Sequence, residues 1–175
     1  MRASRRVLAA ALLCFSNLCL PILAAAQSSD QVIAERILGP QWRQLSRRAG
    51  MIFAGTVLAT GPEPVATVGR TLPGAIPAIQ LRLRVDAAIA GVEHGQVLTI
   101  REWTGAQSMH RPMNPGQHIL LFLYPLSRLG LTSPVGGSRG QVFLDPSGKN
   151  VSRSGGVSVL QLERAIRRAR SEEEQ

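Results

Sequence analysis

The pentapeptide GGSRG at residues 136–140 fits the G-x-S-x-G pattern, in which a serine on a sharp turn is the nucleophile of an α/β-hydrolase. That serine needs a strand before it, a helix after it and a histidine later in the chain. A strand pattern at residues 141–144 follows Ser138 instead, and no histidine lies beyond His118. We therefore predict a flexible glycine turn, and an anion held by its backbone amides is the alternative.

Three histidines, His94, His110 and His118, are suited by type to proton transfer or metal binding. No two of them have the i, i+4 spacing that places two ligands on one helix face, and no acidic residues cluster around them. We predict three separate surface or boundary histidines. The sequence indicates no metal site, no cofactor and no catalytic residue.

Three carboxylates, Asp86, Glu93 and Glu102, could supply a pair for general acid–base catalysis. Glu102 lies beside Trp103 near the end of a predicted strand. Nothing in their spacing brings two of them together, so we predict solvated carboxylates.

A basic and aromatic sheet face is the strongest binding candidate. Residues 79–86 (IQLRLRVD) alternate apolar and polar side chains, which predicts a strand with one buried face and one solvent face. Such a face can bind a ligand, and ordinary solvent-facing arginines are the alternative. The candidate binding residues are Arg82, Arg84, Arg101, Trp103 and Tyr124.

Short strands separated by turns must position these residues. Strand patterns occupy residues 51–60, 79–86, 97–103, 118–124 and 141–144, and a last short strand near 149–152 is expected to close the sheet. Glycine and proline fill seven of the 17 positions of residues 61–77, which predicts a surface loop. No βαβ alternation appears, so we expect a small antiparallel barrel of five or six strands.

Helices are expected at both ends of the barrel. Residues 29–48 have helical periodicity, interrupted at Gly39 and Pro40. At the other end Ser158 and Gln161 fit a capping box, and Val157 can pack on Leu162. The buried stripe of this last helix is predicted to be Val159, Leu162, Ile166 and Ala169, with a frayed acidic tail after it.

The first 26 residues have the layout of a cleavable signal peptide. Arginines at positions 2, 5 and 6 precede an apolar segment at 7–23, and Ala24 to Ala26 form a small-residue cleavage region before Gln27. An uncleaved membrane anchor is the alternative, and the paired arginines also resemble a twin-arginine signal. We predict export to the periplasm or the medium.

Composition limits the mature chain further. Cleavage leaves 149 of 175 residues, enough for one domain, and removes both cysteines. The remaining 17 basic and 11 acidic residues give a net charge of about +6. Export argues against nucleic acid as a partner, so we expect a protein or an anionic envelope component. The sequence gives no oligomeric state.

The order of these segments resembles a known group. The runs FAGTV, VD and VLTIREW are followed by NPGQHILLFLYP and GLTSPVGGSRGQVFL. Over residues 49–154 this resembles a group of exported bacterial domains whose layout is like OB-fold barrels of the tissue-inhibitor/netrin type. Tissue inhibitors chelate a protease's zinc through an amino-terminal cysteine. The mature chain has no cysteine, so that chemistry carries over to no residue here.

The sequence therefore predicts four segments. They are a signal peptide (1–26), an N-terminal helical segment (27–48), an OB-like barrel domain (49–156), and a C-terminal helix with a frayed tail (157–175). The function we expect is a non-enzymatic envelope binding module. A hydrolase with a His/Glu site and a protease-inhibitor-like module are the alternatives.

Overall fold

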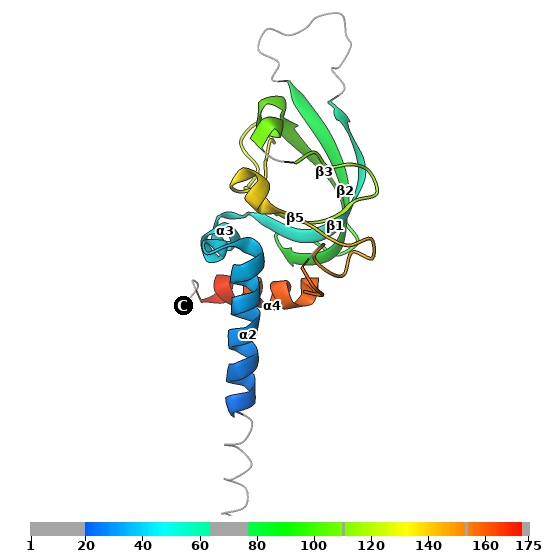
Figure 1. Ribbon diagram of the computed structural model, residues 1–175. Coiled ribbons are helices and arrows are strands. Elements are labelled where there is room, and N and C mark those ends of the chain that lie inside the picture. Colours follow the sequence, from blue (N-terminus) through cyan, green and yellow to red (C-terminus); the bar gives the residue numbers. More distant parts are fainter. Residues whose placement is uncertain (1–19, 64–76, 110, 153, 173–175) are drawn as a thin grey trace, which may run out of the picture.

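The computed structural model describes residues 20–63, 77–109, 111–152 and 154–172 of the 175-residue chain, which is mainly β with helices at both ends (Figure 1). The helices are α2 (Leu20–Leu38), α3 (Trp42–Arg48) and α4 (Val159–Ser171), with short 3-10 helices η1 (Thr104–Met109) and η2 (Gly137–Gly140). The strands are β1 (Met51–Pro62), β2 (Ala78–Ala90), β3 (Val97–Trp103), β4 (His118–Leu123) and β5 (Gln141–Phe143). No helix in the described ranges is long and apolar enough to cross a membrane.

The five strands form one antiparallel sheet in the order β3-β2-β1-β4-β5. The edge strands β3 and β5 do not pair with each other, so the sheet is not closed and the predicted barrel is not confirmed. The predicted strand near residues 149–152 was wrong, because only isolated bridges form there. The Asp145 carboxylate accepts hydrogen bonds from the Lys149 and Asn150 amides, which keeps these donors in a turn.

The sheet is bent, and it has an apolar cluster on each side. The register of β1 against β2 shifts three times, and such bulges bend a strand and increase its twist. Alternate residues of β1 and β4 then face opposite clusters. Ile52 and Phe122 pack toward the helices, whereas Phe53 and Leu121 pack against β2 and β3.

Both predicted helical regions are present. The break between α2 and α3 lies at Gly39, which has a φ of +86° and whose amide donates to Glu35 O at 2.9 Å, as expected for a left-handed helix end. Ser158 and Gln161 form the predicted capping box of α4. Its predicted stripe is buried, with Ala165 added.

Ion pairs and backbone contacts join the helices to one another and to the sheet. Arg164 of α4 donates to both carboxylate oxygens of Asp30 of α2, at 2.8 and 3.1 Å, and Asp30 is only 4% exposed. Arg170 donates to the carbonyls of Ser46 and Ala49, so it caps the end of α3. Part of the basic charge near the C-terminus therefore holds the fold together.

The predicted signal peptide and loop lie mainly outside the described residues. Of the signal peptide, residues 1–19 are not described, and of the predicted loop 61–77, residues 64–76 are not described. The predicted frayed tail beyond position 172 is also outside this range.

Candidate binding surfaces

Arg82 and Arg84 lie on the solvent face of β2, as predicted, and both are exposed. Arg84 is already paired, because its Nε donates to Asp86 Oδ1 at 2.8 Å. The side chain of Arg82 has no hydrogen bond or ion pair within the described part of the chain. In the pairing of β2 with its neighbours, Arg82 is opposite Thr99 of β3.

Arg101 of β3 is also paired, since Glu63 binds its guanidinium through both carboxylate oxygens, at 2.6 Å to Nε and 2.9 Å to Nη2. The hydrogen bond that Arg101 donates to Glu63 raises the pKa of Arg101 above its ordinary value. Its Nη1 donates to the carbonyl of Leu129 at 3.0 Å. Trp103, two positions along the same strand, is 52% exposed, and Tyr124 beyond β4 is 36% exposed. The five predicted residues therefore do not form one free basic row.

The structure brings together a polar network that the sequence did not reveal. Thr56 of β1 is opposite Arg84 of β2 on one side and His118 of β4 on the other. Its hydroxyl donates to Asp86 Oδ2 at 2.5 Å and lies 3.1 Å from His118 Nδ1. His118 Nδ1 lies 3.7 Å from the same carboxylate oxygen. Glycine at position 55 permits this approach, because a Cβ there would lie 2.4 Å from the Arg84 carbonyl oxygen.

Hydrogen bonds and nearby charges stabilise the ionised form of Asp86 in this network. Burial raises the pKa of Asp86, but hydrogen bonds from Thr56 and Arg84, together with the charges of Arg84 and His118, outweigh it and lower that pKa. Because the Thr56 proton is donated to Asp86, the Thr56 oxygen is left to accept a hydrogen bond from His118 Nδ1. No group of three potential metal-ligating side chains occurs in the described ranges.

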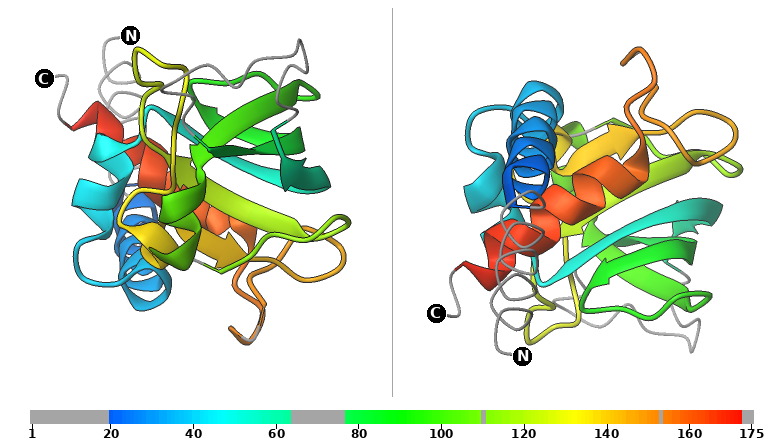
Figure 2. Two further views of the ribbon diagram at one scale, coloured as in Figure 1. Left: turned by 90° about the horizontal axis from the view of Figure 1, so that it is seen from above. Right: turned by 90° about the horizontal axis from the view of Figure 1, so that it is seen from below.

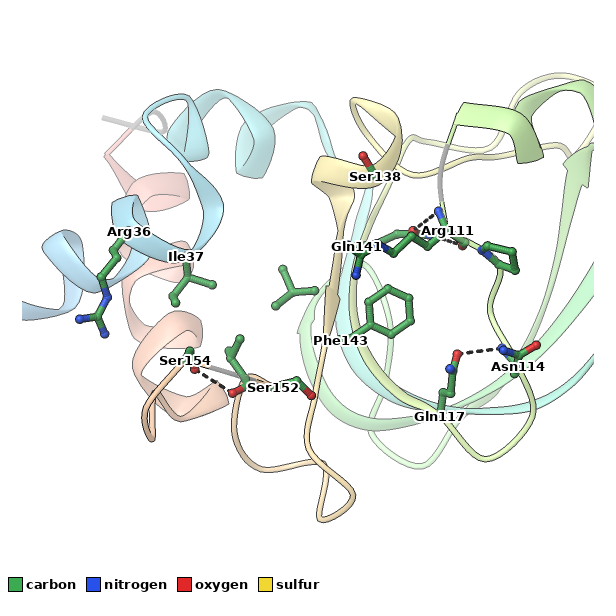
Figure 3. A pocket seen from close by; sticks show the side chains of 13 residues that line it. Arg36, Ile37, Arg111, Asn114, Gln117, Ser138, Gln141, Phe143, Ser152 and Ser154 are labelled. Carbon is green, nitrogen blue, oxygen red and sulfur yellow. Dashed lines mark hydrogen bonds between the residues drawn. The ribbon is translucent and has the colours of Figure 1, made fainter.

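An open groove of about 1070 Å³ separates the end of α2 from β5 (Figure 3). Figure 3 shows Arg36 and Ile37 on the α2 side and Gln141 and Phe143 on the strand side. No aspartate or glutamate is among its described lining residues. The polar lining residues are Arg36, Arg111, Asn114, Gln117, Ser138, Gln141, Ser152 and Ser154.

Arg111 is held in position at this groove. Its amide donates to Gln141 Oε1 at 3.1 Å, and Gln141 Nε2 donates to the Arg111 carbonyl at 3.3 Å. Its guanidinium carbon lies 5.9 Å from the centre of the Phe143 ring, within cation–π range. Gln141 is itself 7% exposed, so a buried amide fixes the backbone of a groove arginine. No sequence pattern pointed to Arg36 or Arg111, because they come from distant parts of the chain and lie on opposite sides of the groove (Figure 3).

The remaining sequence candidates are dispersed. Ser138 lies in η2, which leads into β5, so it lacks the strand–serine–helix geometry of a hydrolase elbow. His94 is exposed in the turn between β2 and β3, where Glu93 is also exposed, and His110 lies outside the described residues.

The prediction of a solvated Glu102 was wrong, because its side chain is buried. Glu102 is 1% exposed. It follows Ile100 at a spacing of two on β3, so it shares the strand face that turns inward. The predicted His/Glu site is therefore not assembled around Glu102 and His94, because one is buried in the sheet and the other is exposed in a turn.

Comparisons with known proteins assign no family to this chain. No protein-family model, curated protein or solved structure matches the chain.

Proposed function

We propose that this chain is an exported, non-enzymatic binding module whose groove between α2 and β5 binds an anionic component of the cell envelope. The observation that carries the proposal is the charge of the groove. Arg36 and Arg111 both line it, and no acidic side chain does so among the described residues. A carboxylate or phosphate group entering there would meet positive charge, neutral hydrogen-bonding groups and apolar side chains, and no carboxylate among the described lining residues.

Preorganisation supports binding at this place. Gln141 fixes the backbone of Arg111 and the Phe143 ring lies within cation–π range of its guanidinium, so part of the entropy cost of ordering Arg111 is met before an anion binds. Arg36, exposed at the rim, adds a second positive charge. The open shape suits a segment of an extended polymer more than a small enclosed substrate.

The lining chemistry favours binding over catalysis. It contains no histidine, cysteine or carboxylate among the described residues, so nothing there can exchange a proton near neutral pH. The Thr56, Asp86 and His118 side chains do not line this groove, and they bind one another on the three adjacent strands β1, β2 and β4.

The test measures binding of a labelled oligoglutamate by fluorescence anisotropy, with oligoglutamine as the neutral control. The R36Q/R111Q variant is expected to lose at least about tenfold in affinity, because it removes two charge-assisted contacts. R47Q/R48Q removes the same charge from α3 and is expected to change affinity by about twofold at physiological salt. Equal losses in both variants would show non-specific attraction and refute the groove as the site.

A third variant separates the two candidate surfaces. R82Q removes the only arginine of the sequence-predicted sheet face whose side chain has no partner in the described ranges. If R82Q lowers the affinity for oligoglutamate and R36Q/R111Q does not, the anion binds on the β2 face and not in the groove.

We further propose that residues 1–26 are a signal peptide cleaved before Gln27. The basic start, apolar segment and small-residue end support this. Cleavage there would retain Asp30 and its ion pair with Arg164 in the mature chain. Mass spectrometry of the protein purified after export is expected to give an N-terminus at Gln27. An intact N-terminus in the membrane fraction would support an anchor instead.

The OB-like arrangement also stays a proposal. Isolated bridges join Leu131 to Arg101 of β3 and Pro134 to Leu123 of β4. Residues 131–134 thus connect the edge strand β3 to the inner strand β4, which supports a partly open barrel. An experimental structure in which these bridges are absent would contradict it.

A further inference from the structure

The connection between β4 and η2 presents two exposed leucines on a tight turn. Leu126 and Leu129 are each 60% exposed. The Gly130 amide donates to Ser127 O at 2.9 Å, and the Ser127 amide donates to Leu131 O at 2.9 Å. This connection, yellow in Figure 2, projects from the edge of the body in both views. The leucines are therefore held in solvent by a closed turn.

The turn is also fixed to the sheet. Arg101 Nη1 donates to Leu129 O at 3.0 Å, while Glu63 holds the same guanidinium. The Thr132 amide donates to Arg101 O at 2.9 Å, and the Thr132 hydroxyl donates to Tyr124 O at 2.7 Å. A loop braced in this way loses little conformational entropy when its tip is buried.

Two exposed aromatic residues lie on β3, which the Leu131–Arg101 bridge links to this connection, and at the start of the connection itself. Trp103 ends β3 and Tyr124 follows β4. The Trp103 ring lies against Gly105, where a Cβ would come within 2.4 Å of it, so the ring is held although it is half exposed. We name Trp103, Tyr124, Leu126 and Leu129 the loop-tip patch. Single exposed apolar residues are ordinary, whereas a group on adjoining elements indicates an interaction surface.

We propose that the loop-tip patch docks on the surface of an anionic lipid bilayer. Leu126 and Leu129 enter the boundary of the acyl chains, and Trp103 and Tyr124 lie at the level of the headgroups, where such amphipathic rings are favoured. Arg128, exposed between the two leucines, pairs with an anionic headgroup.

The charge of Arg128 and the projecting shape of the turn favour a bilayer as the partner of the loop-tip patch. Arg128 has no side-chain partner in the described ranges, so its charge is available. The carboxylate of Glu63, which binds Arg101 beside the turn, is neutralised by that pair and does not repel the membrane. The projecting turn can enter a soft, flat surface without a matching cavity in the partner.

Trp103 provides a direct measurement of the contact. The chain has two tryptophans, and Trp42 is only 4% exposed, so quenching by brominated lipids reports Trp103. We expect quenching with vesicles containing brominated phosphatidylglycerol, and none in the W103F variant. The measured signal is the quenching of Trp103 and not the total amount of bound protein. Membrane attachment through an uncleaved signal peptide therefore gives no signal by itself.

Matched variants then test each part of the patch. L126S/L129S is expected to need on the order of fiftyfold more lipid for half-quenching. L160S replaces a leucine of similar exposure (64%) on α4 and is expected to change the lipid concentration for half-quenching by no more than about twofold. R128Q is expected to need about fivefold more anionic lipid for half-quenching. R47Q removes the same charge outside the loop-tip patch and is the control.

Several outcomes would overturn the proposal. They are an unquenched wild type, equal effects of L126S/L129S and L160S, and equal quenching by purely zwitterionic brominated vesicles. Far-UV circular dichroism checks that each variant is folded, and the exposure of all substituted side chains predicts that it is. Oligoglutamate binding is expected to be unchanged in L126S/L129S, so failure here leaves the groove proposal standing.

Discussion

Replacement of Thr56 by valine tests the network of Thr56, Asp86 and His118 most directly. Valine keeps the β-branched shape that suits a strand and removes only the hydroxyl. That hydroxyl donates to Asp86 Oδ2 at 2.5 Å and accepts from His118. A hydrogen bond to a charged group contributes about 1.5–3 kcal/mol, and Asp86 retains water because its side chain is 33% exposed. We therefore take the lower end and expect T56V to cost about 1.5 kcal/mol.

The assay is urea unfolding at neutral pH, with the midpoint of thermal unfolding as a second measure. A loss of this size lowers the melting temperature of a domain of about 150 residues by about 3–6 °C. T99V is the matched control, because Thr99 is an exposed strand threonine whose side chain has no partner in the described ranges. It is expected to change stability by about 0.5 kcal/mol or less.

Acid titration and a double-mutant cycle complete the test. The folded state lowers the pKa of Asp86, so its contribution is fully present above the unfolded value of 3.8 and is lost as pH falls through the folded pKa. The stability gap between wild type and D86N is expected to narrow below pH 3.8. T56V and D86N are expected to be non-additive by about 1 kcal/mol. Additive effects, or a T56V cost equal to that of T99V, would refute the network.

Three further substitutions test how the fold is held together, each by urea unfolding. Leu162 of α4 is fully buried, so L162A is expected to cost about 3 kcal/mol, and a cost below about 1 kcal/mol would contradict the packing of α4. S158A removes the capping box with Gln161 and is expected to cost about 1 kcal/mol, whereas an unchanged midpoint would show that the cap adds nothing. G55A places a Cβ 2.4 Å from the Arg84 carbonyl and is expected to cost about 2 kcal/mol, and a neutral result would mean that β1 can shift there.

Local patterns predicted most of the elements. The alternation at residues 79–86 and the Ser158–Gln161 cap involve neighbours in the chain, and both are confirmed. Closure of the sheet depends on which distant strands meet, and periodicity carries no information on that. The error at residues 149–152 had a local origin, because the Asp145 carboxylate competes with the strand ladder for backbone donors.

Site residues were harder to predict, because they come from elements that are far apart in sequence. Thr56 and His118 are 62 positions apart and become neighbours only through the β1–β4 register. Arg36 and Arg111 line opposite sides of a groove between a helix and a strand. Glu102 was misjudged by residue type, since its place on β3 and not its charge decides its burial.

Which arginines are paired with carboxylates, more than the total number of arginines, indicates where an anionic partner could bind this basic chain. Arg84, Arg101 and Arg164 are exposed or half-exposed, yet each is neutralised by a carboxylate, so each contributes mainly to the fold. Arg36 by the groove, Arg82 on β2 and Arg128 on the turn are exposed, and no carboxylate pair is found for them in the described ranges, so their positive charge is left for a partner. Removing a paired arginine also frees its carboxylate. A variant such as R101Q would therefore weaken membrane and polymer binding through the freed Glu63 charge and a loosened turn, which makes it a poor test of direct contact.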